Sequence, residues 1–230
     1  MFALACCRRI RTLIDATPVR RLVELTEEHL EGRVSSQDVA EARRAVRRLT
    51  RAISSVDFDE PVPFQPFGGL AVACAAEDGP DWDVSVVLDH AVGAVVDAVR
   101  DRAGPSLHDP RSRRFDRQLT RVESAAESAE KRERRGQAAL LRDVVGNPFR
   151  SGYVDPSWLS WNGGAVTKLA RVLHDERSLP AGTLDNARLA VLADALEDAG
   201  CTDAVVLDHC RGPGPHVRGC WVVDAVLGKE

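Results

Sequence analysis

The segment Gly200-Cys-Thr-Asp-Ala-Val-Val-Leu-Asp-His-Cys-Arg-Gly-Pro-Gly-Pro-His-Val-Arg-Gly-Cys-Trp221 indicates how the C-terminal part of this chain folds. Before its Gly-Pro-Gly-Pro turn, Thr202 can cap a short helix that runs to Cys210, and after the turn residues 217–227 predict the last helix. Three of the six cysteines and two of the six histidines lie within 20 residues here. The segment is therefore either a metal site or a compact packing unit.

The residues before this segment show the same pattern of short helices separated by glycine and proline. Apolar residues at helical spacing form two faces, one through Val166, Leu169 and Leu173 and one through Leu189, Leu192 and Leu196. Gly200 ends the second helix, Asp155-Pro156 caps a short turn that carries Trp158, and Gly146-Asn147-Pro148 ends a segment that starts at Gln137. Residues 137–230 are therefore predicted to form a compact helical unit.

The N-terminal part predicts a helical hairpin or three-helix unit over residues 1–60. Thr17-Pro18 starts one helix, Gly32 stops it, and residues 3–14 form a shorter helix before it. Ser35 and Asp38 resemble a capping box that opens the clearest helix of the chain. Its apolar residues repeat at gaps of three and four: Val39, Ala42, Val46, Leu49 and Ile53. Packing of residues 137–230 with 1–60 as one domain is an alternative to separate units.

The middle of the chain, residues 61–136, is predicted to be variable. Prolines and glycines from Pro61 to Gly69 mark a linker, and two helices follow over 69–77 and 82–102, with a strand as the alternative for the valine-rich second one. A break runs from Pro105 to Pro110. Residues 112–135 are almost continuously polar and predict a long solvated helix or a partly disordered arm. The whole pattern predicts an all-α fold, an irregular multi-helix bundle.

Charge and hydropathy argue against a nucleic-acid-binding or membrane-spanning protein. The net charge of −4 gives no overall attraction to nucleic acid, although residues 1–54 are basic and residues 55–110 are acidic. No apolar run approaches the ~20 residues that a membrane span needs, and no signal-peptide pattern opens the chain. We therefore expect a soluble cytoplasmic protein whose six cysteines are thiols or metal ligands rather than disulfides.

Two blocks of this sequence resemble an uncharacterised family of alanine-rich proteins that is abundant in planctomycete bacteria. The first is Ala5-Cys-Cys-Arg-Arg-Ile10 with Arg20-Arg-Leu-Val-Glu24. The second runs from Gln137 to the end and includes Leu140-Leu-Arg-Asp-Val-Val-Gly-Asn-Pro-Phe-Arg150, Asp155-Pro-Ser-Trp-Leu159 and the Cys/His segment quoted above. Relatives typically carry a further helical segment before the Cys-Cys-Arg-Arg motif. The resemblance implies a helical fold and implies no activity or catalytic residue.

The first chemical hypothesis is a zinc site formed by Cys201, Cys210, His216 and Cys220. Thiolate and imidazole are the preferred ligands of Zn²⁺, and four of them suffice for a structural site. No Cys-x2-Cys pair is present, however, and the gap from Cys201 to Cys210 matches no common zinc finger. The opposing interpretation is that these are small buried thiols and that His216 bonds a helix end.

Three further hypotheses are weaker. A thiol nucleophile would be Cys210 or Cys220, with His209 or His216 as its base and Asp208 or Asp224 to orient that base. Phosphate capture would use the turn from Arg211 to Pro215 with Arg218, but two prolines remove backbone donors there. Nucleic-acid binding would use the arginines of 43–51 or 111–121. Few aromatic residues are interleaved with these arginines, and solvent-exposed helix faces explain them better.

These observations favour a non-catalytic helical scaffold or protein-interaction module, with protein as the partner and with neither membrane nor nucleic acid involved. No cofactor is required. The alternative is a small zinc-binding or thiol-dependent protein centred on the Cys/His segment.

Overall fold

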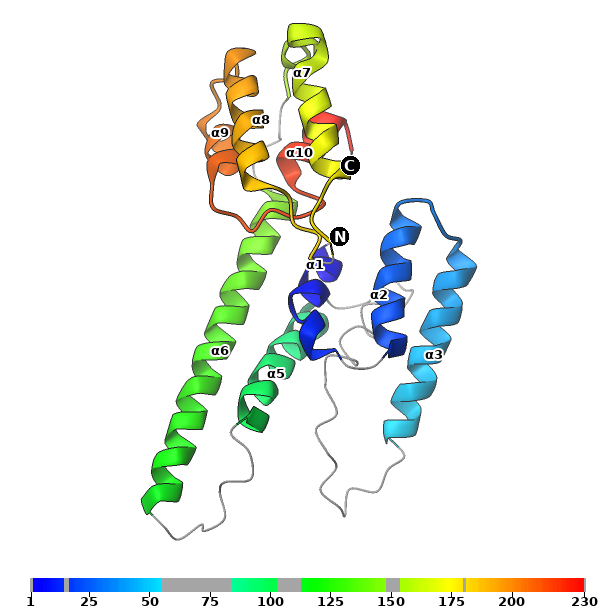
Figure 1. Ribbon diagram of the computed structural model, residues 1–230, viewed down its shortest axis with the longest axis vertical. Coiled ribbons are helices and arrows are strands. Elements are labelled where there is room, and N and C mark those ends of the chain that lie inside the picture. The colour runs from blue at the N-terminus through cyan, green and yellow to red at the C-terminus, as the bar shows by residue number, and fades with distance from the viewer. Residues whose placement is uncertain are drawn as a thin grey trace. The chain divides into compact units, whose positions relative to one another are not determined.

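The computed structural model describes residues 2–14, 17–54, 84–102, 113–147, 154–179 and 181–229. Over these residues the chain forms nine α-helices, one 3₁₀ turn and two isolated β-bridges, with no strand (Figure 1). The all-α prediction is confirmed. The predicted helix over 69–77, the linker from Pro61 to Gly69 and the break from Pro105 to Pro110 lie outside the described residues.

The chain divides into two compact units, one of residues 6–135 and one of residues 136–230 together with 1–5. The first holds the second half of α1 (Phe2–Arg9), η1 (Arg11–Leu13), α2 (Thr17–Leu30), α3 (Ser36–Ser54), α5 (Val84–Arg102) and most of α6 (Arg113–Val145). The C-terminal unit, as we call the second, holds the end of α6, α7 (Pro156–Asp175), α8 (Asn186–Asp198), α9 (Ala204–Arg211) and α10 (Trp221–Leu227). None of the described helices is both long enough and apolar enough to cross a membrane.

Helices α2 and α3 form the predicted hairpin (Figure 1). Its interface is built from the apolar stripes of both helices: Val19, Leu22, Val23, Leu25, Val39, Ala42 and Val46. The capping box is confirmed, because Asp38 Oδ2 accepts from the Ser35 N–H at 2.9 Å and Ser35 Oγ accepts from the Asp38 N–H at 3.3 Å. Gly32, at φ +70°, follows the end of α2 as predicted.

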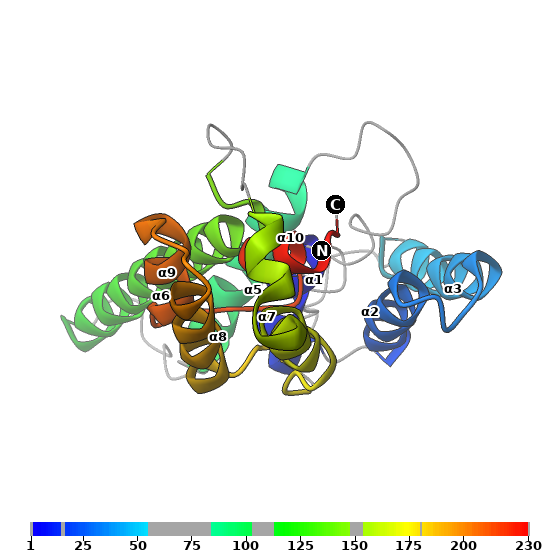
Figure 2. The same cartoon turned by 90° about the horizontal axis from the view of Figure 1, so that it is seen from above.

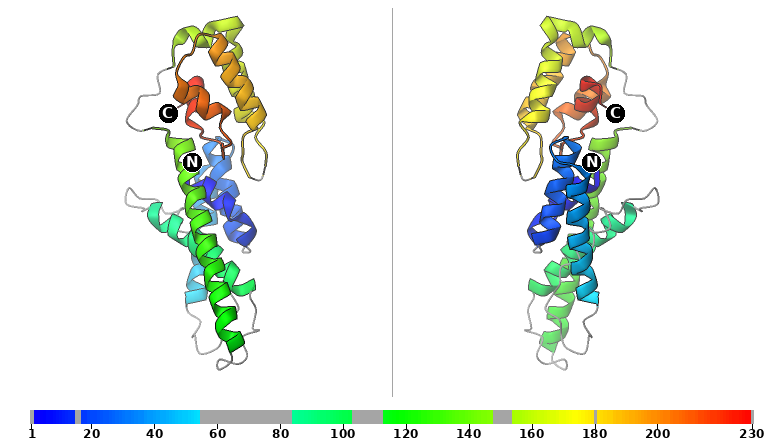
Figure 3. Two further views of the ribbon diagram at one scale, coloured as in Figure 1. Left: turned by 90° about the vertical axis from the view of Figure 1, so that its left-hand side faces the viewer. Right: turned by 90° about the vertical axis from the view of Figure 1, so that its right-hand side faces the viewer.

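Helix α5 settles the ambiguity of the valine-rich segment, and the strand alternative is wrong. Helix α6 is longer than predicted, because it runs unbroken for 33 residues through Gly136 (Figure 3). One glycine inside a helix lowers its stability by only about 1 kcal/mol relative to alanine. Ion pairs such as that of Glu130 with Arg134, at 3.0 Å, stabilise the polar part of α6. The alternative of a partly disordered arm is therefore wrong for residues 113–135. Gly146, at φ +66°, follows the last helical residue.

The C-terminal unit has one apolar core, formed by α7–α10 and their connections. Helices α7 and α8 lie side by side (Figure 2), α9 packs on α8, and α10 packs on α7. Leucines fill its centre, and Leu189, Leu192 and Leu196 are fully buried. Trp158, Trp161 and Trp221 pack against this core. Among the described residues, the core cluster contains none from α6.

Helix boundaries in this unit follow specific caps. Asp155 accepts from the Ser157 N–H at 2.8 Å, as the Asp-Pro pattern predicts. The cap of α9 is Asp203, which accepts from the Val205 N–H at 2.9 Å, so the prediction of Thr202 is wrong by one residue. The last helix begins at Trp221 rather than at Val217, because Val217 instead forms a bridge with Thr183.

Candidate metal site

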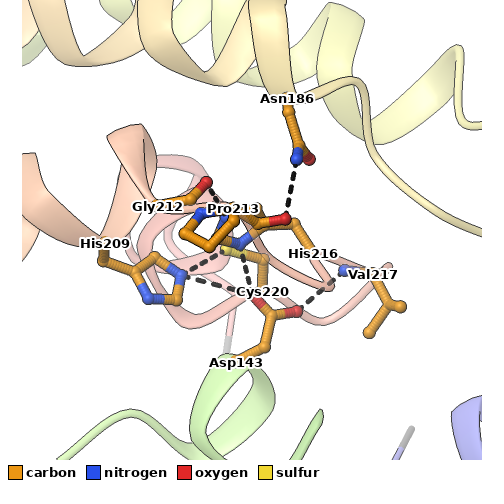
Figure 4. Close-up of polar contacts among 8 residues, drawn as sticks. All are labelled: Asp143, Asn186, His209, Gly212, Pro213, His216, Val217 and Cys220. Atoms are coloured by element: carbon orange, nitrogen blue, oxygen red, sulfur yellow. Dashed lines mark hydrogen bonds and ion pairs between the residues drawn. The ribbon is translucent and has the colours of Figure 1, made fainter. Parts of the chain in front are cut away.

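Four potential metal ligands converge within the C-terminal unit: Asp143, His209, His216 and Cys220. Asp143 lies in the last turn of α6 and His209 in the last turn of α9. His216 lies in the connection between α9 and α10, and Cys220 precedes the first residue of α10. One ligand atom from each lies within 4.8 Å of all the others (Figure 4). We call these four residues the Asp-His-His-Cys cluster.

The Gly-Pro-Gly-Pro turn places His216 in the cluster. Gly214 has φ +80°, and a Cβ at this position would lie 2.8 Å from the His216 backbone nitrogen, so only glycine fits. The turn is fixed at both ends. Asn186 Nδ2 donates to the Pro213 carbonyl at 2.9 Å (Figure 4), and the Leu184 N–H donates to the His216 carbonyl at 2.8 Å. The prolines and glycines therefore position a ligand as well as connect two helices.

Asp143 is the centre of the cluster. Its Oδ1 lies 2.8 Å from His216 Nδ1 and 3.2 Å from His209 Nε2, while its Oδ2 accepts from the Val217 N–H at 2.8 Å. His209 Nε2 also lies 3.2 Å from Cys220 Sγ. The outer nitrogen of His216, Nε2, lies 3.3 Å from the Gly212 carbonyl oxygen. The contacts of Asp143 join α6 to residues 66–74 positions later in the chain, whereas the other two lie within residues 209–220.

Without a metal, the hydrogen bonds of this cluster can all form only if one imidazole carries a positive charge. Both neighbours of His216, a carboxylate and a carbonyl, are acceptors, and a neutral imidazole has one N–H to give. His209 has the same difficulty at a single atom, because its Nε2 cannot donate to Asp143 and accept from the Cys220 thiol at once. Without a metal, the contacts of His216 are satisfied when it is an imidazolium paired with the carboxylate.

A divalent cation satisfies the same atoms without a charged imidazole. The lone pairs of Asp143 Oδ1, His216 Nδ1, His209 Nε2 and the Cys220 thiolate would all face the ion. The His216 Nε2–H would remain on the Gly212 carbonyl, and the Val217 N–H would remain on Asp143 Oδ2. Such outer hydrogen bonds are typical of metal-bound histidine and carboxylate. Two anionic and two neutral ligands around a 2+ ion also give a buried site of zero net charge.

Burial and hydrogen bonding act in opposite directions on the pKa values of Asp143 and His216, whereas burial sets the pKa of Cys220. Burial raises the pKa of the Cys220 thiol well above its ordinary value, and the Asp143 charge raises it further. For Asp143, burial would raise the pKa, but hydrogen bonds from His209, His216 and the Val217 N–H together lower it. For His216, burial would lower the pKa, but the hydrogen bond and charge of Asp143 together raise it. The carboxylate is therefore ionised, and the metal-free thiol is protonated.

The structure brings together only part of the zinc set predicted from sequence. His216 and Cys220 lie in the Asp-His-His-Cys cluster. Cys201 and Cys210 are buried in the apolar core, and burial raises the pKa of both thiols, that of Cys210 to about 12. All five described cysteines are free and buried.

Two residues of the cluster were not in that predicted set. Asp143 has a signal in the sequence, because it is an acidic residue on the same helix face as Leu140, which is itself buried. His209 was considered only as a base for a thiol. The four come from three separate segments, so sequence spacing alone could not unite them.

The geometry of the cluster does not fit the hypothesis of a thiol nucleophile. In a Cys–His–Asp triad the sulfur and the carboxylate contact different nitrogens of the imidazole. Here Cys220 and Asp143 both contact Nε2 of His209, and neither Asp208, which is exposed, nor Asp224, which is half-buried, contributes to the cluster. The pKa of Cys220 is raised by burial, whereas a reactive thiol needs a lowered one.

The arginines of the phosphate and nucleic-acid hypotheses lie outside the Asp-His-His-Cys cluster. Arg211 Nη2 donates to Asp194 at 2.8 Å and to Glu197 at 2.5 Å, and these contacts link α9 to α8. The guanidinium proposed to bind phosphate is therefore already paired with two carboxylates. The arginine-rich faces belong to the unit of residues 6–135, where Arg44 and Arg48 are exposed on α3.

Comparison of this chain with protein-family models, with curated proteins and with solved structures finds no match. The geometry of the Asp-His-His-Cys cluster is therefore the observation that bears most directly on function.

Proposed function

We propose that the C-terminal unit is built around a structural zinc ion held by Asp143, His209, His216 and Cys220, in a non-catalytic protein that acts as a scaffold or interaction module. The observation that carries the proposal is the convergence of one carboxylate, two imidazoles and one thiol within 4.8 Å inside the fold. Oxygen, nitrogen and sulfur donors of these kinds are the ordinary ligands of Zn²⁺.

The spacing of the ligand atoms suits a tetrahedral ion. With bonds of about 2.0–2.3 Å, neighbouring ligands of such an ion lie about 3.3–3.6 Å apart. The three closest contacts in the cluster measure 2.8, 3.2 and 3.2 Å, and no pair exceeds 4.8 Å. Movements of less than about 1 Å at each side chain would bring them to tetrahedral positions.

The number of ligands supports a structural role rather than a catalytic one. A catalytic zinc ion keeps one position for water or substrate, whereas a structural ion is closed by four protein ligands. The side chains of Asp143 and His216 are 3% and 4% exposed, and Cys220 is fully buried. A cytoplasmic, reducing environment belongs to the proposal, because Cys220 must remain a free thiol to bind the ion as thiolate.

The test is metal content after purification under reducing conditions. The full chain should contain one zinc ion, and replacement by Co²⁺ should give the intense visible bands of a tetrahedral site with one thiolate ligand. Zinc-free protein that remains fully folded and takes up neither metal contradicts the proposal.

Two cysteine variants distinguish the Asp-His-His-Cys cluster from the set predicted by sequence. Cys220→Ala should lose the zinc and the sulfur-to-cobalt absorption. Cys201→Ala is the matched control, because Cys201 is an equally buried cysteine of the same core but is not in the cluster. It should keep both. Loss of the metal from Cys201→Ala would instead favour Cys201, Cys210, His216 and Cys220 as the ligands.

A further inference from the structure

The last turns of α6 are attached to the C-terminal unit in a different way from the other helices of that unit. Helices α7–α10 share one apolar core, and among the described residues that core includes none from α6. On α6 itself, Leu140 is buried but lies outside that core, while Leu141 and Val145 are 45% and 51% exposed. Apolar burial therefore accounts for less of the attachment of α6 than for that of its neighbours.

The polar contacts of Asp143 link this part of α6 to α9–α10. The carboxylate reaches His216, His209 and the Val217 N–H, which lie 66–74 residues further along the chain. It is 3% exposed in its side chain. Next to it, Gly146 contacts the Trp221 ring, with a Cβ position 2.9 Å from Trp221 Cγ. The carboxylate of Asp143 and the contact of Gly146 with the Trp221 ring thus both join this part of α6 to the α9–α10 region.

The ligand set of the proposed zinc site is divided between the same parts. Asp143 is the ligand from α6, while His209, His216 and Cys220 come from the α9–α10 region. An ion at this position would therefore cross-link α6 to helices whose own core does not depend on α6.

We propose that zinc occupancy controls whether the end of α6, residues 137–147, is docked on the C-terminal unit. The inference rests on the proposed zinc site and assigns it a regulatory consequence. With zinc bound, the carboxylate of Asp143 is a ligand and the helix end is held. Without zinc, the apolar core of α7–α10 stays folded, and the last turns of α6 detach more often.

Amide hydrogen exchange of the full chain tests this inference, with and without one equivalent of zinc. Exchange in peptides covering 137–147 should slow at least about tenfold when zinc binds, because local opening then requires breaking a metal bond. Exchange in peptides covering 189–196, at the centre of the core, should change less than about twofold.

The variant Asp143→Asn removes the anionic ligand and keeps an oxygen for the Val217 N–H. It should exchange rapidly over 137–147 at any zinc concentration, while the slow exchange of 189–196 shows that the core is folded. The matched control is Asp198→Asn, at an exposed carboxylate of the same unit, which should behave like the unmodified chain.

The outcomes separate the two proposals. A chain that binds one zinc ion but exchanges equally fast over 137–147 with and without it overturns the docking inference and leaves the zinc site standing. A chain that binds no zinc overturns both. Equal slowing in both sets of peptides also overturns the inference, because zinc would then stabilise the unit as a whole.

Discussion

Asp143 and Gly146 lie three residues apart at the end of α6, and both have requirements that only one residue type meets well. The carboxylate of Asp143 is buried among two imidazoles and a backbone N–H. Gly146 adopts φ +66° and lies against the ring of Trp221. The short motif Asp-Val-Val-Gly therefore carries a residue of the Asp-His-His-Cys cluster, a helix end and an aromatic contact.

The Gly146→Ala substitution should destabilise the C-terminal unit more than a substitution at another left-handed glycine. Gly228 has nearly the same φ, +64°, but a Cβ there would contact nothing within 4 Å. Both changes bear the cost of a left-handed alanine, about 1–2 kcal/mol, and only Gly146→Ala adds a clash worth about 1–3 kcal/mol. Urea unfolding followed by tryptophan fluorescence measures both. Equal destabilisation by the two variants would mean that the Trp221 contact is unimportant.

At the scale of the element, α3 and α8 are each defined by a cap at one end and a buried stripe along one side. Ser35 and Asp38 exchange hydrogen bonds at the start of α3, and Asp185 accepts from the N–H groups of Ala187 and Arg188 at the start of α8. Leu189, Leu192 and Leu196 follow on the buried face of α8. Local signals of this kind define a helix before tertiary contacts form.

Ser35→Ala should weaken the start of α3 by about 1 kcal/mol at neutral pH, the usual cost of losing such a cap. Hydrogen bonds from the Ser35 hydroxyl and backbone N–H hold the pKa of Asp38 below its ordinary value of 3.8. Since the folded pKa is the lower one, this stabilisation is present above pH 3.8 and is lost as the pH falls through the folded value. The difference between variant and unmodified chain should therefore shrink in acid.

The control for this measurement is Ser36→Ala, the same change at an exposed neighbour, which should stay within about 0.5 kcal/mol of the unmodified chain. Thermal unfolding followed by circular dichroism at pH 7 and pH 3 gives both comparisons. A Ser35→Ala effect that is independent of pH contradicts the capping-box explanation.

Leu192→Ala should cost about 2–5 kcal/mol, because the side chain is fully buried in a close-packed core and its loss leaves a cavity. Val191→Ala, one residue earlier on the same helix, removes a side chain that is 50% exposed and should cost less than about 0.5 kcal/mol. Three of the four tryptophans lie in the C-terminal unit, so fluorescence-detected urea unfolding reports mainly on it. Similar costs for both variants would contradict the assignment of the buried face.

At the scale of the whole molecule, zinc should stabilise one part of the chain and not the other. The four ligands all lie in the C-terminal unit, and the unit of residues 6–135 contributes none of them. A ligand at a hundred times its dissociation constant stabilises the state that binds it by about 2.7 kcal/mol. Chelation should therefore speed amide exchange over residues 137–147, which belong to the C-terminal unit, and leave exchange in the α2–α3 hairpin unchanged.

Zinc retention should also depend on pH in a direction set by the ligands. Imidazole and thiol must lose protons to bind the ion, so affinity rises with pH, and zinc retained at pH 7.5 should be released below about pH 5. Metal content after dialysis at a series of pH values measures this. Tighter retention in acid would rule out histidine and cysteine as the ligands.

Most of the fold could be predicted from local signals. The capping box at Ser35, the Asp155-Pro156 helix start and the stop at Gly200 all act within a few residues, and each is present in the structure. The predictions that were wrong concern the cap of α9, placed at Thr202 instead of Asp203, and the start of α10. There, a bridge from Val217 to Thr183, 34 residues earlier, outcompetes the local helical pattern.

The sequence by itself determined the helical class, the position of most helices and two residues of the Asp-His-His-Cys cluster, His216 and Cys220, which lie in the Gly-Pro-Gly-Pro connection or just beyond it. Only the tertiary structure decided that Asp143 and His209 complete the cluster while Cys201 and Cys210 enter the core. The physical reason is the distance along the chain over which each kind of interaction acts. Helix periods and caps depend on neighbours along the chain, whereas a ligand set depends on where separate helices end in space, and that is fixed only when their apolar faces pack.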